Sequence, residues 1–147
     1  MNLATNKRAW HDFEILHEFE AGIVLFGHET KAAKAGQVSL KGSHVAIIRN
    51  ELFLINAAIS RYAKAESDPS YDQRRTRKLL VRREEIRRLV GTVSAQGLTL
   101  IPLSLYTKGQ LVKLKFGLAR QKKKYDKRQT MKDKDAARDI SRRLKVR

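Results

Sequence analysis

Residues 98–116 read LTLIPLSLYTKGQLVKLKF and contain two neighbouring strand patterns. In residues 112–116, apolar side chains alternate strictly with lysines, which is the period of a strand with one buried face. Residues 98–105 form a second strand-like run, and the polar segment 107–110 between the two runs contains a glycine. The stretch therefore predicts an antiparallel hairpin. Because Pro102 cannot donate a ladder hydrogen bond, we expect a bulge or an edge position there.

Further strands are predicted upstream of this hairpin. Residues 13–19 alternate between apolar and acidic side chains, less regularly from His17 onward. Residues 45–48 and 52–55 are two β-rich runs separated by three polar residues, which predicts another hairpin. Together with the apolar segment 23–26, the count before residue 119 is five or six short strands. This pattern favours a small barrel, closed or partly open.

Two short helices and one long loop complete this part of the chain. The helices are expected over residues 28–35 and 83–90, ended by Gly36 and Gly91. Residues 61–77 are polar and are predicted to form a long surface loop, which in a small domain is usually functional. The expected fold class is thus mainly β with short helices.

The positive charge is confined to the second half of the chain. Residues 1–70 carry eight basic and eight acidic side chains, residues 71–119 carry eleven and three, and residues 120–147 carry thirteen and four, so the net charge of +17 arises entirely after residue 70. Such self-repulsion does not stabilise a fold, and a polyanionic partner explains it best. A membrane surface is disfavoured because the basic tail lacks bulky apolar anchors.

Composition excludes several classes of protein. There is no cysteine, so disulfides and thiolate metal sites are excluded, and the four histidines show no metal-binding spacing. No apolar run is long enough to span a membrane and no signal peptide is recognisable, so we expect a cytoplasmic protein. No pattern indicates a catalytic, metal or cofactor site. A nuclease using carboxylates such as Glu84 and Glu85 remains an alternative.

The basic side chains form three candidate groups for RNA binding. Two project from the lysine strand and four crowd the end of the polar loop, where they would contact phosphates; they are Lys113, Lys115, Arg74, Arg75, Arg77 and Lys78. The third group combines cations with an aromatic ring that can stack on a base: Lys122, Lys123, Lys124, Tyr125, Asp126, Lys127 and Arg128.

The tail is predicted to be separate from the barrel. Ala136, Ile140 and Leu144 recur every four residues, which encodes a weak helix with a thin apolar stripe. We expect residues 120–147 to be disordered when free and helical when bound, and residues 1–119 to form the RNA-binding barrel.

A set of short motifs in this order resembles the small protein B family, bacterial proteins that bind transfer-messenger RNA and rescue stalled ribosomes. The motifs are Asn6-Lys7-Arg8-Ala9, Phe19-Glu20-Ala21-Gly22, Glu29-Thr30-Lys31, Ala35-Gly36, Ser43-His44-Val45, Arg77-Lys78-Leu79-Leu80, Gly97-Leu98-Thr99, Leu103-Ser104-Leu105-Tyr106 and Tyr125-Asp126-Lys127-Arg128.

The resemblance implies a barrel of the oligonucleotide-binding (OB) type that binds the tRNA-like domain of the RNA and delivers it to the ribosome for trans-translation. It implies that Glu20, Leu80 and Lys113 belong to the RNA surface, and that the tail occupies the vacant decoding centre and mRNA path, with Tyr125 stacking on small-subunit RNA. The expected partners are transfer-messenger RNA and the ribosome, bound by a monomer without a cofactor. A generic ribosomal or single-strand-binding barrel is the other reading.

Overall fold

The computed structural model describes residues 1–62 and 70–122. These residues contain nine strands and three helices, more than the sequence pattern predicts, because several strands are too short to show a period. In chain order the elements are β1 (Asn2–Thr5), α1 (Ala9–Asp12), β2 (Phe13–Ile23), α2 (Gly27–Lys34), β3 (Val38–Ser39), β4 (His44–Ile48), β5 (Glu51–Ile55), β6 (Ala58–Ile59), β7 (Arg77–Leu80), α3 (Arg83–Gln96), β8 (Thr99–Lys108) and β9 (Leu111–Gln121).

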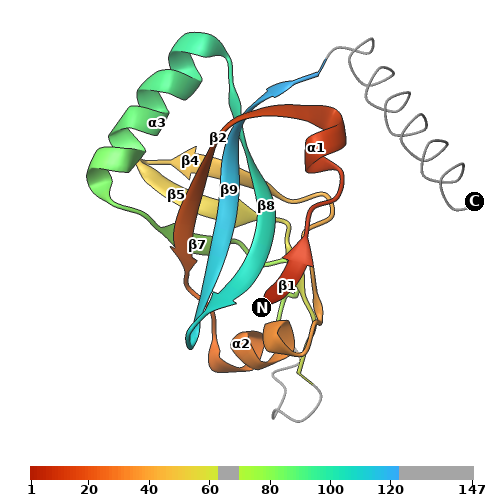
Figure 1. Ribbon diagram of the computed structural model, residues 1–147. Helices are drawn as coiled ribbons and strands as arrows, with labels where there is room; N and C mark the ends of the chain where they lie inside the picture. Colours follow the sequence, from red (N-terminus) through yellow and green to blue (C-terminus); the bar gives the residue numbers. More distant parts are fainter. Residues whose placement is uncertain (63–69, 123–147) are drawn as a thin grey trace, which may run out of the picture.

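Six strands close into a ring (Figure 1). Its order is β8-β4-β5-β7-β2-β9 and back to β8, and every neighbouring pair is antiparallel. β1 pairs with β8 beyond the position where β8 meets β4. The predicted fold class, a mainly β protein with a small antiparallel barrel of the OB type and short helices, is confirmed.

The hairpin predicted from residues 98–116 is β8–β9. Lys108 pairs with Leu111, so the turn is the two residues between them, with Gly109 at a φ of 64°. The bulge expected at Pro102 is present, because Pro102 pairs with Phe116 and Ser104 with the adjacent residue of β9, which leaves Leu103 as the extra residue. The β4–β5 hairpin is also confirmed.

A second bulge explains why the alternation in residues 13–19 is irregular. Ile15 pairs with Ala119 and His17 pairs with Leu118, so one residue of β2, Leu16, has no partner in β9. Before the bulge, Ile15 packs against a small apolar cluster that includes Ala9 of α1. After the bulge, Phe19 faces the main core. The bulge thus changes which face of β2 is buried.

The helices α3 and α2 lie at opposite ends of the barrel (Figure 1). Ile86 and Leu89 of α3, and Ala33 of α2, belong to the main core. The predicted end of α3 at Gly91 is wrong, because the helix continues to Gln96 and ends at a left-handed glycine, residue 97. Packing of the following turn against the core offsets the cost of a glycine inside a helix, about 1 kcal/mol.

Candidate RNA-binding surface

A row of outward-facing residues crosses four strands of the barrel. Leu80 of β7 pairs with Gly22 of β2, Gly22 pairs with Lys113 of β9, and Lys113 pairs with Tyr106 of β8. Leu80 is 55% exposed, and its Cβ lies 3.3 Å from where a Cβ on Gly22 would be. The glycine therefore leaves room for Leu80 on the outer face.

Glu20 lies next to this row and is held as a carboxylate. It pairs across β2–β9 with Lys115, and it accepts hydrogen bonds from the Tyr106 hydroxyl and from Lys108 Nζ at 3.4 Å. The hydrogen bond from Tyr106 is the largest influence that lowers the pKa of Glu20, and Lys108 and Lys113 act in the same direction. Burial and the same carboxylate raise the pKa of Tyr106. At neutral pH, Glu20 is therefore ionised and the Tyr106 hydroxyl is protonated.

The two lysines of β9 project from the outer face, as their alternation predicts, because Val112, Leu114 and Phe116 are buried in the core. Lys115 Nζ lies 3.8 Å from Glu18 Oε2 and 6.0 Å from the centre of the Tyr106 ring. We call the surface formed by Glu20, Leu80, Tyr106, Lys113 and Lys115 the β2–β9 face. It combines cations, one carboxylate, an aromatic ring and one exposed apolar side chain.

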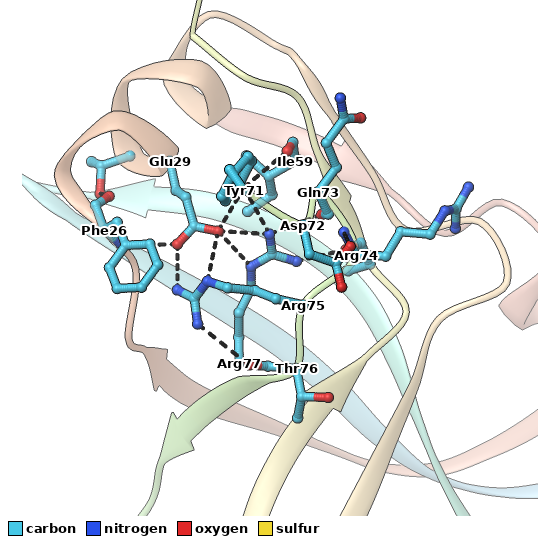
Figure 2. Close-up of polar contacts among 12 residues, drawn as sticks. Phe26, Glu29, Ile59, Tyr71, Asp72, Gln73, Arg74, Arg75, Thr76 and Arg77 are labelled. Atoms are coloured by element: carbon cyan, nitrogen blue, oxygen red, sulfur yellow. Dashed lines mark hydrogen bonds and ion pairs between the residues drawn. The ribbon is translucent and has the colours of Figure 1, made fainter. Parts of the chain in front are cut away.

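The basic cluster predicted at the end of the polar loop is organised around a buried carboxylate (Figure 2). Glu29 of α2 is fully buried and accepts hydrogen bonds from Arg77 Nε at 3.0 Å and Nη2 at 2.6 Å. Arg75 donates to both oxygens of Glu29, and Tyr71 donates to Oε2 at 2.8 Å. The amide of Phe26, the residue before α2, donates to Oε1 at 2.8 Å. One carboxylate thus joins α2 to residues 71–77.

The titration of this network follows from its contacts. Burial raises the pKa of Glu29, but hydrogen bonds from Arg75, the Phe26 amide, Arg77 and Tyr71 outweigh it and hold the pKa at about 2. Burial and the adjacent carboxylate raise the pKa of Tyr71 to about 12. Glu29 is therefore ionised and Tyr71 neutral at physiological pH.

The four predicted loop cations have different surroundings. The sequence predicts Arg77 at the surface, but in the structure it is the buried partner of Glu29. It is the first residue of β7 and is fully buried. Its guanidinium also donates to the carbonyls of Ala57 at 2.6 Å and Gln73 at 2.9 Å. Its predicted place in a surface cluster is wrong, because Glu29, 48 positions earlier in the chain, draws it into the interior.

The other three cations retain some exposure. Arg75 is half-buried, with its guanidinium carbon 4.0 Å from the centre of the Phe26 ring. Arg74 is exposed and donates to Asn56 Oδ1 at 3.4 Å. Lys78 projects from β7 and lies 3.4 Å from Glu51. The loop therefore does not provide a single basic patch.

Most of the predicted tail contacts lie outside the described residues: Lys123, Lys124, Tyr125, Asp126, Lys127, Arg128, Ala136, Ile140 and Leu144. Lys122 is described, and its backbone amide donates to the Asp12 carbonyl at 2.9 Å while its Nζ donates to the Trp10 carbonyl at 3.0 Å. The last strand of the barrel runs to Gln121, two residues beyond the expected boundary.

Tyr106 lies beside Glu20 in the structure, although no local sequence pattern predicts a role for it. Its outward direction is encoded, since it alternates with the buried Leu105. Its contact with Glu20 depends on the register of strands 86 positions apart and cannot be inferred from local pattern. Within the described ranges, no group of three acidic or histidine side chains is arranged to hold a metal ion, and no helix is long and apolar enough to span a membrane.

The model of the family described as SmpB protein matches residues 3–146. This chain belongs to the SmpB protein family. The SsrA-binding protein of Chloroflexus aurantiacus is 48% identical over 143 residues, covering 97% of this chain and 89% of that protein. The SsrA-binding protein of Nitrosomonas europaea is 47% identical over 147 residues, covering 100% and 97%.

A solved structure agrees with this membership of the SmpB family. It is described as "tmRNA-SmpB: a journey to the center of the bacterial ribosome" and is 46% identical to this chain. The match has a TM-score of 0.66 and covers 82% of this chain and 84% of that one. The resemblance of the sequence motifs to the small protein B family is therefore confirmed.

Proposed function

We propose that this protein binds the tRNA-like domain of transfer-messenger RNA and delivers it to stalled ribosomes for trans-translation. Membership of the SmpB family supports this function, as do the SsrA-binding relatives and the similarity to a structure whose description names tmRNA and the bacterial ribosome. The protein acts in the cytoplasm by binding and positioning RNA and is not an enzyme.

The β2–β9 face is the observation that carries the proposal. Lys113 and Lys115 neutralise phosphates, while Leu80 and the Tyr106 ring offer apolar contact to bases or sugars. Glu20 repels phosphate. A surface that bound polyanions by charge alone, without regard to their shape, would therefore be weakened by a carboxylate between its two lysines. An ionised carboxylate instead accepts hydrogen bonds from base N–H groups or a 2′-hydroxyl. The face is thus suited to one RNA shape.

Strands β2, β7, β8 and β9 of the barrel supply this face, and the tail supplies the second activity. We assign residues 1–121 to the barrel, because β9 pairs with β2 as far as Gln121, and the residues after it to the ribosome-binding tail. In this proposal the cations Lys122, Lys123, Lys124, Lys127 and Arg128 contact the small-subunit RNA, Tyr125 stacks there beside Asp126, and the helix carrying Ala136, Ile140 and Leu144 forms in the vacant mRNA path.

Binding across a salt series tests the RNA specificity. The purified protein is titrated with a tRNA-like fragment of transfer-messenger RNA and with an elongator tRNA. We expect tighter binding to the fragment that persists at high salt, with a shallow slope of roughly 3 to 6 released ions. Equal affinities with one steep slope would contradict the proposal, since charge alone would then explain binding.

Two neighbouring carboxylates on β2 provide the control for this experiment. Glu20→Gln should reduce the preference for the fragment by about tenfold, the usual size of one lost specific polar contact of about 1.4 kcal/mol. Glu18→Gln removes the same charge from the same strand and should leave the preference unchanged.

Replacing the tail tests its separate role. A variant with a Gly/Ser chain in place of residues 131–147 should bind the tRNA-like fragment with wild-type affinity but fail to support the rescue of stalled ribosomes. The physical reason is that the barrel carries the RNA contacts while the helix that would form in the mRNA path has been removed. Rescue at the wild-type rate would reject the role of the tail helix.

A further inference from the structure

A basic groove lies beside the β2–β9 face, between the β4–β5 turn, β7 and the first half of α3. The hollow has a volume of about 510 Å³. Its charged lining consists of one carboxylate, Glu51, and four cations: Arg49, Lys78, Arg83 and Arg87. We call this hollow the α3 groove.

The charge of the α3 groove is largely unbalanced. Lys78 lies 3.4 Å from Glu51, and this is a solvent-exposed pair. Arg49, Arg83 and Arg87 are exposed, and none of them forms an ion pair with any residue in the described ranges. The groove therefore presents a net charge of +3 from five titratable side chains.

The three unpaired arginines stand at positions where a different residue would suit the fold better. Arg49 has a φ of 52° in the left-handed region, which asparagine or glycine adopts more readily in a two-residue hairpin turn. Arg83 is the first residue of α3, where the helix dipole disfavours a cation. Arg87 lies one turn later on the same helix face and repels Arg83.

Three local costs that meet in one groove indicate a ligand that offsets them. Each of these arginines lowers the stability of the element that holds it, and no described residue compensates their charge. A bound anion would do so directly, and a run of phosphates matches several guanidinium groups spread along a groove better than one small anion does.

Leu80 connects the α3 groove to the β2–β9 face. It lines the groove, and it also begins the row that continues through Gly22 to Lys113. An RNA backbone bound on the β2–β9 face can therefore pass Leu80 and enter the groove without leaving the protein surface. A single ligand would then contact both surfaces.

We propose that the α3 groove binds consecutive phosphates of the RNA held on the β2–β9 face, through Arg49, Arg83 and Arg87. This inference rests on the proposed function and extends it. The β2–β9 face recognises the RNA, and the groove adds salt-dependent affinity without base specificity.

The triple variant R49N/R83Q/R87Q tests the groove. Asparagine accepts the left-handed conformation at position 49, and glutamine is a good helix former at positions 83 and 87, so the variant should fold. With the tRNA-like fragment, the number of released ions should fall by about 2 to 3, and affinity near physiological salt should fall about tenfold or more.

The control variant K31Q/K41Q/R88Q removes the same number of charges from exposed positions outside the groove. Arg88 adjoins Arg87 on α3 but lines a separate hollow between α3 and β2. RNA binding by this control variant should release at least two more ions than RNA binding by the triple variant. Equal slopes and affinities for the two variants would overturn the proposed role of the groove, because only the net charge of the protein would then determine binding.

Single variants and a second RNA separate the remaining outcomes. If the triple variant does not fold, R87Q compared with R88Q decides, and equal slopes for this pair again overturn the proposal. If the wild-type protein does not prefer the tRNA-like fragment over elongator tRNA, the proposed function fails. If it does prefer the fragment while the groove and control variants behave alike, only the groove fails.

Discussion

At the scale of single residues, Glu29 and Arg77 form the centre of the loop structure. Both side chains are fully buried, and the carboxylate accepts hydrogen bonds from the Phe26 amide, just before α2, and from residues 71–77. Arg77→Met should lower the free energy of unfolding by about 3–5 kcal/mol, because it leaves the Glu29 charge buried with fewer partners. Urea unfolding at neutral pH measures this loss.

Arg74 is the matched control for that variant. It lies three residues earlier and is exposed, and among the described residues its side chain makes only long hydrogen bonds, to Asn56 at 3.3 and 3.4 Å. Arg74→Gln should change the free energy of unfolding by less than about 1 kcal/mol. If R77M were as stable as R74Q, the network would not hold the loop.

The pKa of Glu29 gives this network a pH dependence. Its folded value of about 2 lies below the ordinary 4.5, so its contribution is complete above pH 4.5 and disappears as the pH falls toward 2. The contribution is of the order of 3 kcal/mol. The stability of wild type minus that of Glu29→Gln, from urea unfolding at pH 7 and pH 2.5, should shrink by about this amount. A constant difference would argue against an ionised, buried Glu29.

At the scale of elements, two glycines give opposite predictions for the same substitution. Gly91 lies inside α3 with no atom within 4 Å of a new Cβ, so Gly91→Ala should stabilise the protein by about 0.5–1 kcal/mol. In β9, a Cβ on Gly117 would lie 2.9 Å from Ile15 Cγ2, so Gly117→Ala should destabilise it by about 1–3 kcal/mol. Thermal unfolding of the two variants should shift in opposite directions, and a shift of the same sign would contradict the packing of β2 on β9.

Features that depend on local pattern could be predicted from the sequence, whereas contacts between distant elements could not. The β4–β5 and β8–β9 hairpins were predictable because each depends on alternation and a nearby turn. The outward direction of Lys113 and Lys115 followed from the same period. The burial of Arg77 was not predictable, because its partner Glu29 is distant in the chain. The α3 groove was missed for a similar reason, since Arg49 and Arg87 come together only when the barrel closes.

At the scale of the whole molecule, the positive charge lies in the second half of the chain, whereas both halves contribute strands to the barrel. The first 70 residues are electrically neutral and contribute Glu20, Glu29 and the strands β1 to β6. The cations of the β2–β9 face, and all but one of those in the α3 groove, come from the second half. Folding therefore places the cations of the second half on a framework that the neutral half helps to build.

Closure of the ring also has a consequence for how the protein is made. Phe13 pairs with Gln121, so β2 leaves the ribosome long before its partner β9 exists. A nascent chain that stops before Leu111 has β2 and β8 without the strand that joins them, and unpaired strand edges promote aggregation. A chain whose synthesis is interrupted before β9 therefore cannot close the barrel.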